Sequence, residues 1–278
     1  MITTPSLVVS SAVARWIDGG TALATLLPTA GNQVVEQLAR MDRLCGLALV
    51  GSETCLAALG TSWREYAAHT AVLCGSRNGC LATDAAFYRG VLAGEASPRL
   101  FAYTLHSAPA GAVSIQHGLW GPGSTAVGST IAGLQALEEA CLLLSAGQVH
   151  ACLVLSCDTE WTADHDVVAA LYLTQSSALR ASVSPWRVVA VRSSFCPGHA
   201  QQALSQVMEY LRQQVPQVAD AYVLGAEGPP LALMAELLHG TVPAGAQQPE
   251  PPTDTVVMAA TDAQGYAAAA VLRRCTGR

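Results

Sequence analysis

Apolar residues occur along this chain in two arrangements, as short uninterrupted runs and as runs at helical spacing. The uninterrupted runs predict buried strands at 6–15, 69–73, 149–156 and 167–174, the last two forming an antiparallel pair. Helical spacing predicts helices within 33–60, where we expect Gly51 to separate two of them, and at 84–92, 108–115 and 131–146. Apolar strands that alternate with helices are typical of a sheet covered on both faces. The pattern therefore predicts an α/β fold.

The last third of the chain repeats this order in a shorter form. We expect a strand at 186–193, a helix at 199–215, a short strand at 221–225 and a closing hairpin of 255–260 with 266–273. Both parts begin with a strand and end with a strand pair. This indicates an internal duplication with an N-terminal half at 1–183 and a truncated C-terminal half at 184–278.

Composition indicates that another protein covers part of the surface. Hydrophobic residues make up 51% of the 278 residues and charged residues only 12%, about half of the usual charged share of roughly 25%. The net charge of −6 and the lack of a basic stripe argue against nucleic acid as a partner. No apolar run approaches the roughly 18 residues that a membrane span needs, and the N-terminal residues do not resemble a signal peptide. We therefore expect a cytoplasmic protein with no membrane segment.

The nine cysteines do not form a recognisable metal site or disulfide framework. Most of them lie inside apolar segments, where cysteine acts as a small hydrophobic residue. His69 is the nearest histidine in sequence to Cys74 and Cys80, and it completes no familiar zinc-site spacing. We expect reduced, structural thiols, and neither a metal nor a cofactor.

A strand-to-helix turn is the most distinctive feature of the chain. Residues 119–134 read LWGPGSTAVGSTIAGL, and Thr130 occupies the position at which such a turn would place a nucleophile. A threonine hydroxyl is far less acidic than a thiol and reacts only with an adjacent base. The turn therefore has the form of a nucleophile elbow without a strong nucleophile.

Residues 97–160 around this turn resemble the β-ketoacyl synthase family, which has the thiolase fold. The closing segment TVVMAATDAQGYAAAAVLRR resembles the Gly-rich hairpin that ends synthase chains. The resemblance implies duplicated α/β halves in layers α-β-α-β-α, here with a shortened second half. It also places the synthase cysteine at Thr130 and the first catalytic histidine at or beside Ala226. A Pro-rich loop at 243–252 replaces most of the segment for the second histidine, which leaves His239 as a weak candidate.

The missing catalytic residues make the chain similar to chain-length factors, the non-catalytic partners of ketosynthases in polyketide and fatty-acid-like synthesis. Its shortened second half is most similar to small subunits of aryl polyene systems. The resemblance implies that this chain forms a heterodimer with a ketosynthase and has no catalytic residue of its own. An acyl carrier protein would bind to the heterodimer. The resemblance also implies that Leu100, Phe101 and Thr104 line the partner's acyl tunnel, although Leu100 and Phe101 could equally be core residues. The dimer interface is expected at Ser124, Thr125, Ala126, Val127 and Gly128.

Other functions stay open at this point. The chain could be an acyltransferase or thioesterase-like enzyme that uses Thr130 or Cys157, or a docking scaffold for an acyl carrier protein. His106 is either a polar gate or a surface histidine. Asp158 and Glu160 follow a buried strand two residues apart, for which we expect a structural role rather than acid–base chemistry.

Overall fold

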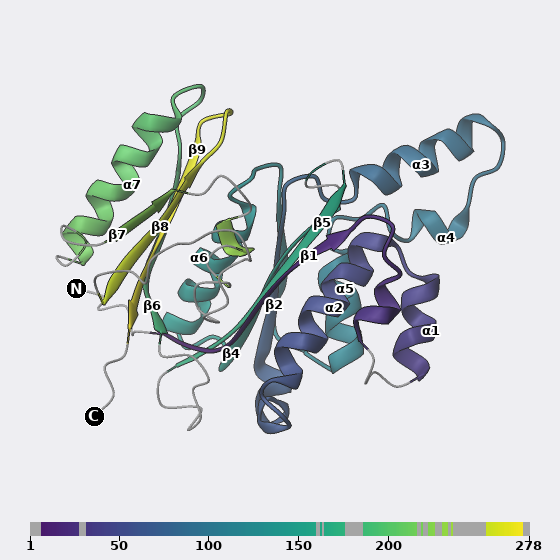
Figure 1. Ribbon diagram of the computed structural model, residues 1–278, viewed down its shortest axis with the longest axis horizontal. Coiled ribbons are helices and arrows are strands. Elements are labelled where there is room, and N and C mark those ends of the chain that lie inside the picture. Colours follow the sequence, from purple (N-terminus) through teal and green to yellow (C-terminus); the bar gives the residue numbers. More distant parts are fainter. Residues whose placement is uncertain are drawn as a thin grey trace.

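Nine strands form one mixed sheet in the order β3-β2-β4-β5-β1-β6-β9-β8-β7 (Figure 1). The computed structural model describes residues 7–27, 32–159, 162, 164–175, 186–215, 218, 222–225, 230–232, 235 and 254–274. The strands are β1 (Leu7–Asp18), β2 (Thr70–Ser76), β3 (Gly123–Val127), β4 (Ala151–Asp158), β5 (His165–Gln175), β6 (Trp186–Phe195), β7 (Tyr222–Gly225), β8 (Thr255–Thr261) and β9 (Tyr266–Arg274). All of them except β3 lie where the apolar runs predict strands, and β3 lies in the segment for which the family resemblance implies an interface.

The sheet consists of two halves that share one topology. In the first half β2 pairs parallel with β4, β4 antiparallel with β5, and β5 antiparallel with β1. In the second half β7, β8, β9 and β6 repeat these pairings in the same order and directions. β1 and β6 join the halves through only two residue pairs, Leu7 with Val188 and Val8 with Arg187. The duplication is therefore confirmed; the predicted boundary between residues 183 and 184 lies outside the described residues.

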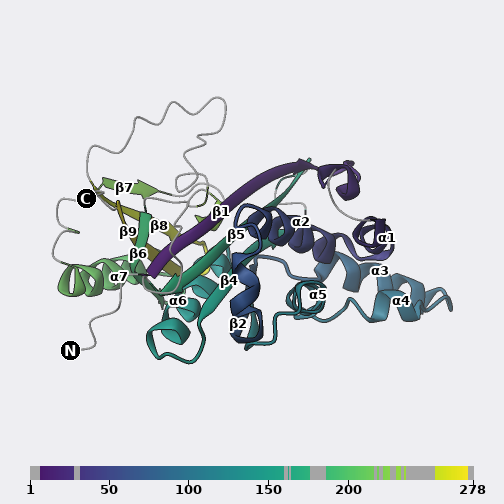
Figure 2. The ribbon, with the colours of Figure 1, turned by 90° about the horizontal axis from the view of Figure 1, so that it is seen from below.

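The helices complete a five-layer arrangement (Figures 1 and 2). They are α1 (Asn32–Arg40), α2 (Arg43–Ala57), α3 (Leu81–Leu92), α4 (Pro98–Phe101), α5 (Ala108–His117), α6 (Ala132–Ser145) and α7 (Ala200–Gln214), with 3-10 turns η1 (Leu23–Leu26) and η2 (Ser62–His69). α2 and α5 cover the outer face of the first half-sheet, α7 covers that of the second, and α6 lies between the two half-sheets. The first half has β3 in addition, and the described part of the second half has no counterpart to it. The layers α-β-α-β-α and the shortened second half are both as predicted.

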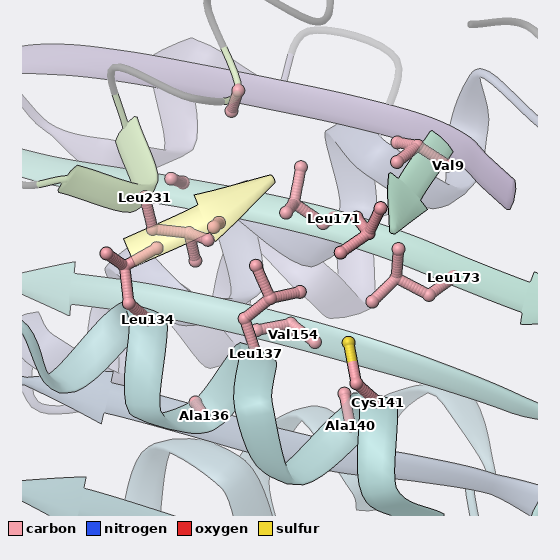
Figure 3. Packing of buried hydrophobic residues seen from close by; sticks show 14 of the residues in the cluster. Val9, Leu134, Ala136, Leu137, Ala140, Cys141, Val154, Leu171, Leu173 and Leu231 are labelled. Carbon is pink, nitrogen blue, oxygen red and sulfur yellow. The ribbon is translucent and has the colours of Figure 1, made fainter. Parts of the chain in front are cut away.

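α6 is the central element of this arrangement. Leu134, Leu137, Ala140 and Leu144 recur at helical spacing and are all completely buried. They pack against side chains from both half-sheets, including Val154 of β4 (Figure 3) and Met258 of β8. Burying a leucine side chain contributes about 1.5–3 kcal/mol, so this helix holds the two halves together.

The prediction that Gly51 separates two helices is wrong. α2 runs through Gly51, and the break comes at Asp42, whose carboxylate caps α2 by accepting a hydrogen bond from the N–H of Leu44 at 3.1 Å. A Cβ atom at Gly51 would lie 2.5 Å from Cγ2 of Val168 in β5. Glycine is needed here because α2 approaches the sheet closely. None of the described helices is long and apolar enough to cross a membrane.

Candidate functional site

The predicted elbow is present between β3 and α6. The chain leaves β3 at Gly128, whose φ of 104° favours glycine, and passes through Ser129 and Thr130 to the first turn of α6. The start of α6 touches the backbone of β2, since a Cβ atom at Gly75 would lie 2.4 Å from the main chain of Ala132 and Gly133. This contact fixes the position of the elbow against the sheet.

Thr130 has no activating group in this arrangement. Its Oγ1 is buried and has no hydrogen-bond partner, so none of the histidines in the described ranges bonds to it. The neighbouring Ser129 donates a hydrogen bond to Oδ2 of Asp262 at 2.5 Å and accepts one from the N–H of Ile131 at 3.2 Å. A threonine hydroxyl without a base is not a nucleophile at neutral pH. The described elbow therefore has the strand, turn and helix of a nucleophile elbow, but no activated nucleophile.

The turn of the β8–β9 hairpin holds the elbow from the second half of the chain. Oδ1 of Asp262 accepts hydrogen bonds from the N–H groups of Gln264, Gly265 and Tyr266 at 3.0, 3.1 and 3.0 Å. Gly265 has a φ of 105°, and a Cβ atom there would lie 2.0 Å from the carbonyl oxygen of Cys196. The turn is rigid, and Asp262 connects it to Ser129.

The predicted tunnel residues lie together at and just after the short helix α4. Leu100 and Phe101 belong to α4, and Thr104 follows it, with its Oγ1 donating to the carbonyl of Phe101 at 2.8 Å. Phe101 is 63% exposed and contacts the ring of Phe87 in α3 at a centroid distance of 5.5 Å. Leu100 is half-buried, so neither residue is an ordinary core residue of this chain. α3 and α4 project from the body as an arm (Figure 1).

The predicted interface segment forms an open edge of the sheet. β3 contains Ser124, Thr125, Ala126 and Val127 of that segment, pairs only with β2, and ends the sheet; its side chains from Ser124 onward are half-buried. Gly128 follows the strand as part of the elbow. An edge strand of this kind can pair with another chain.

A stripe of exposed apolar side chains follows α3. Leu81, Tyr88 and Leu92 recur at helical spacing and are 61%, 62% and 70% exposed; we call them the α3 stripe. Phe101 and Leu105 lie close by in sequence on the same arm and are also exposed. Exposed apolar patches of this extent mark interaction surfaces.

The family of the chain follows from its N-terminal part. Residues 25–182, more than half of the chain, match the family model "Beta-ketoacyl synthase, N-terminal domain". The chain belongs to the β-ketoacyl synthase family. No curated protein matches it.

Solved structures of ketosynthases share its fold. The ishigamide ketosynthase/chain length factor superposes with a TM-score of 0.72 at 20% identity, covering 97% of this chain and 99% of that one. The ketosynthase ApeO in complex with its chain length factor ApeC, from Xenorhabdus doucetiae, gives 0.69 at 11% identity, with coverages of 97% and 98%. AntDE:AntF, a type II polyketide synthase acyl-carrier protein in complex with its ketosynthase, gives 0.73 at 13%, with coverages of 97% and 99%. At these identities the likeness establishes the shared ketosynthase fold.

Asp158, at the end of β4, has the structural role that we expect for it. The residue is 2% exposed, and its Oδ1 accepts hydrogen bonds from Ser76 Oγ at 2.8 Å and from the N–H groups of Arg77 and Asn78 at 2.6 and 3.3 Å. These bonds anchor the loop between β2 and α3. Glu160 lies outside the described residues, as do Ala226 and His239.

Cys157 is unsuited to act as a nucleophile. It is completely buried, and its Sγ lies 3.6 Å from Sγ of Cys74. Its hydrogen bond to Cys74, followed by burial, raises the pKa of Cys157 well above the ordinary thiol value. A buried thiol that stays protonated and faces another thiol instead of a base is inert.

A contact that the sequence did not predict lies at the start of α3. Cys80 Sγ is 3.0 Å from Nδ1 of His106, although 26 residues separate them. His69, the histidine nearest to Cys80 in sequence, instead contacts the ring of His150 in a tilted arrangement with a centroid distance of 4.9 Å. No local spacing signals the Cys80–His106 pair, because the α3–α4 arm has to fold back to form it.

His117 and Asp158 should change the stability of the fold in opposite directions as the pH falls from 6.5 to 4. Burial, followed by the charge of Arg64, lowers the pKa of His117 from 6.5 to about 4, so the stability it contributes above pH 6.5 is lost as the pH falls toward 4. Burial raises the pKa of Asp158 from 3.8 to about 6, so the folded protein takes up a proton and gains stability as the pH falls from 6 to 4. Shifts of this size are each worth about 3 kcal/mol.

Single substitutions should reveal the two opposed contributions. We expect His117→Gln to become more stable relative to the wild type as the pH falls from 6.5 to 4, and Asp158→Asn to become less stable. Urea denaturation at several pH values measures both differences in the free energy of unfolding. Parallel pH profiles for the wild type and either variant would contradict the corresponding assignment.

Proposed function

We propose that this chain is a non-catalytic subunit, similar to chain-length factors, that pairs with a ketosynthase and shapes the acyl tunnel of the heterodimer. The observation that carries this proposal is the elbow: its strand, turn and helix are intact, but Thr130 stands at the nucleophile position with an unbonded hydroxyl. A synthase holds its growing chain as a thioester and needs a thiolate at that position. Ala226 at the expected histidine position agrees with the loss of condensation chemistry.

The surface of the chain supports a protein partner. β3 leaves one edge of the sheet open, and the α3 stripe exposes large apolar side chains close in sequence to Phe101. A charged share of only 12% agrees with a surface that is partly covered. Two of the similar structures are named as ketosynthases with chain length factors. We infer that β3 and the α3 stripe together form the ketosynthase interface.

We assign the tunnel role to residues of the arm. Leu100, Phe101 and Thr104 are not part of the buried core of this chain, so they are free to contact a partner. Apolar side chains of this size can form the end of a tunnel for an alkyl or polyene chain. The products would belong to polyketide, aryl polyene or fatty-acid-like synthesis, with extender units delivered by an acyl carrier protein.

Product length tests this proposal. In a reconstituted system of ketosynthase, acyl carrier protein and this chain, we expect Leu100→Ala and Phe101→Ala to lengthen the products by one or more two-carbon units, because each removes several carbons from the tunnel wall. Mass spectrometry of the released products measures the change.

Two further variants serve as controls in the same assay. Arg99→Ala, on the same short helix, should leave product length unchanged, and Thr130→Val should leave the condensation rate unchanged. An unaltered product length in both alanine variants contradicts the tunnel assignment. A loss of condensation in Thr130→Val would favour the alternative, an acyltransferase or thioesterase-like enzyme.

A further inference from the structure

Cys80 and His106 form a thiol–imidazole pair outside the elbow. Sγ lies 3.0 Å from Nδ1, Cys80 is 2% exposed, and His106 is exposed to solvent. The backbone N–H of Cys80 also points at Nδ1, at 3.4 Å. This N–H donates to Nδ1, so Nδ1 is the acceptor nitrogen of the ring in this contact. The same nitrogen is placed to accept the proton of the thiol.

The geometry of the pair depends on Gly79. This residue has a φ of 55°, and a Cβ atom there would lie 2.5 Å from Nδ1 of His106. Any side chain at position 79 would displace the imidazole from the thiol. Gly79 is in turn held by its N–H, which donates to Ser76 Oγ at 2.8 Å.

A cavity of about 260 Å³ adjoins the thiol, with Cys80, Ala82 and Thr83 in its wall. Ala82 and Thr83 belong to the first turn of α3, where backbone N–H groups have no partner within the helix. Unpaired N–H groups beside a thiol can stabilise the oxyanion that forms when a carbonyl is attacked. Cys80 and the N–H donors thus lie at one cavity, and His106 contacts the thiol from outside the cavity wall.

We propose that Cys80 is an acyl-accepting thiol, with His106 as its base, that takes the acyl group of a short, uncharged acyl thioester. His106 Nδ1 removes the thiol proton, and the sulfur of Cys80 bonds to the carbonyl carbon. The bond from that carbon to the original sulfur then breaks, and His106 returns the proton to the departing thiolate. The products are S-acyl-Cys80 and a free thiol, without any redox change.

The charges around the cavity select against anionic acyl groups. Its wall carries the carboxylates of Asp42 and Asp166 and a single cation, Arg43, which pairs with Asp166 at 2.5 Å. The excess negative charge disfavours a second carboxylate such as that of a malonyl group. An acetyl or other short neutral acyl group is not repelled.

Asp84 restrains the thiol. Oδ2 of Asp84 lies 3.4 Å from Sγ of Cys80, and the carbonyl oxygen of Thr104 lies 3.1 Å from the same sulfur. Burial, and then the hydrogen bond to Asp84, raise the pKa of Cys80 to about 11. The thiol is therefore protonated at rest, and its reaction needs His106 to remove the proton, against which burial and the hydrogen bond to Asp84 both act.

Acylation of the full-length chain alone tests the proposal, independently of any ketosynthase. The protein is incubated at pH 7.5 with the acetyl thioester of N-acetylcysteamine, and the acylated residue is identified and its formation timed by peptide mass spectrometry. We expect one acetyl group on Cys80, at a rate about tenfold lower in His106→Gln and in Gly79→Ala. Asp84→Asn should raise the rate by a similar factor, and the malonyl thioester should react more slowly than the acetyl thioester.

A matched thiol and a check of folding complete the experiment. Cys196 is half-buried, packs against the cluster under α7 and donates a hydrogen bond to Gln206 at 3.6 Å, so Cys196→Ser should leave the rate unchanged. Circular dichroism verifies that the exposed substitution His106→Gln leaves the fold intact. Acylation confined to other cysteines, or a Cys80 rate that is the same in His106→Gln, overturns the proposal. Neither outcome bears on the ketosynthase heterodimer, which product length tests separately.

Discussion

Gly75→Ala should destabilise the protein strongly, although it adds only one methyl group. The new Cβ atom would lie 2.4 Å from backbone atoms of Ala132 and Gly133, and backbone in the first turn of a buried helix cannot move aside as a flexible side chain can. Overpacking of a core costs about 1–3 kcal/mol and occasionally more. We expect the upper end, about 3 kcal/mol, and a melting temperature lower by about 10 °C.

Gly111→Ala is the matched control for this substitution. Gly111 lies in α5 with nothing within 4 Å of its virtual Cβ atom, so alanine should stabilise the helix by up to about 1 kcal/mol. Thermal and urea unfolding of both variants give the comparison. Equal stability of Gly75→Ala and the wild type would mean that α6 does not rest on β2 as closely as described.

Tyr88→Glu combined with Leu92→Glu should abolish the heterodimer while leaving this chain folded. Both side chains are more than half exposed in the α3 stripe, so two carboxylates cost the isolated chain little. Placed in an apolar interface, each would have to be desolvated without a partner. We expect binding to the ketosynthase to weaken at least a hundredfold, which co-purification and titration calorimetry measure.

A second pair of substitutions separates this effect from that of added charge. Gln202→Glu with Ser205→Glu adds the same charge to the exposed surface of α7, on the other half of the molecule. We expect normal binding in this variant. Equal weakening in both would show that net charge, and not the α3 stripe, controls association.

Much of the fold could be predicted from the sequence because its strands are apolar runs with few alternatives. Val149 to Ser156, for example, can only be a strand covered on both faces, and β4 lies at 151–158. Gly51 misled the prediction because glycine weakens an isolated helix, whereas in the fold it permits contact with Val168. Glycine weakens the helix through its own backbone, whereas the contact that it permits is with a strand more than a hundred residues away in sequence.

The site was predictable only where a local pattern defines it. The elbow around Thr130 and the strand after Gly123 are each continuous in sequence, so the strand-to-helix turn could be predicted from its pattern and the strand from the family resemblance. The Cys80–His106 pair depends on the fold of the arm, and the bond between Ser129 and Asp262 joins the two halves of the chain. Pairs of this kind have no periodicity or spacing by which a single sequence could reveal them.

The position of α6 between the half-sheets limits how far evolution can shorten this protein. A subunit without condensation chemistry, as proposed above, would have no chemical use for its second half. However, Leu134, Leu137 and Leu144 are buried by both half-sheets at once, and removing β6 to β9 would expose them to water. A shortened second half must therefore keep its four strands, because they shield one side of α6 from water.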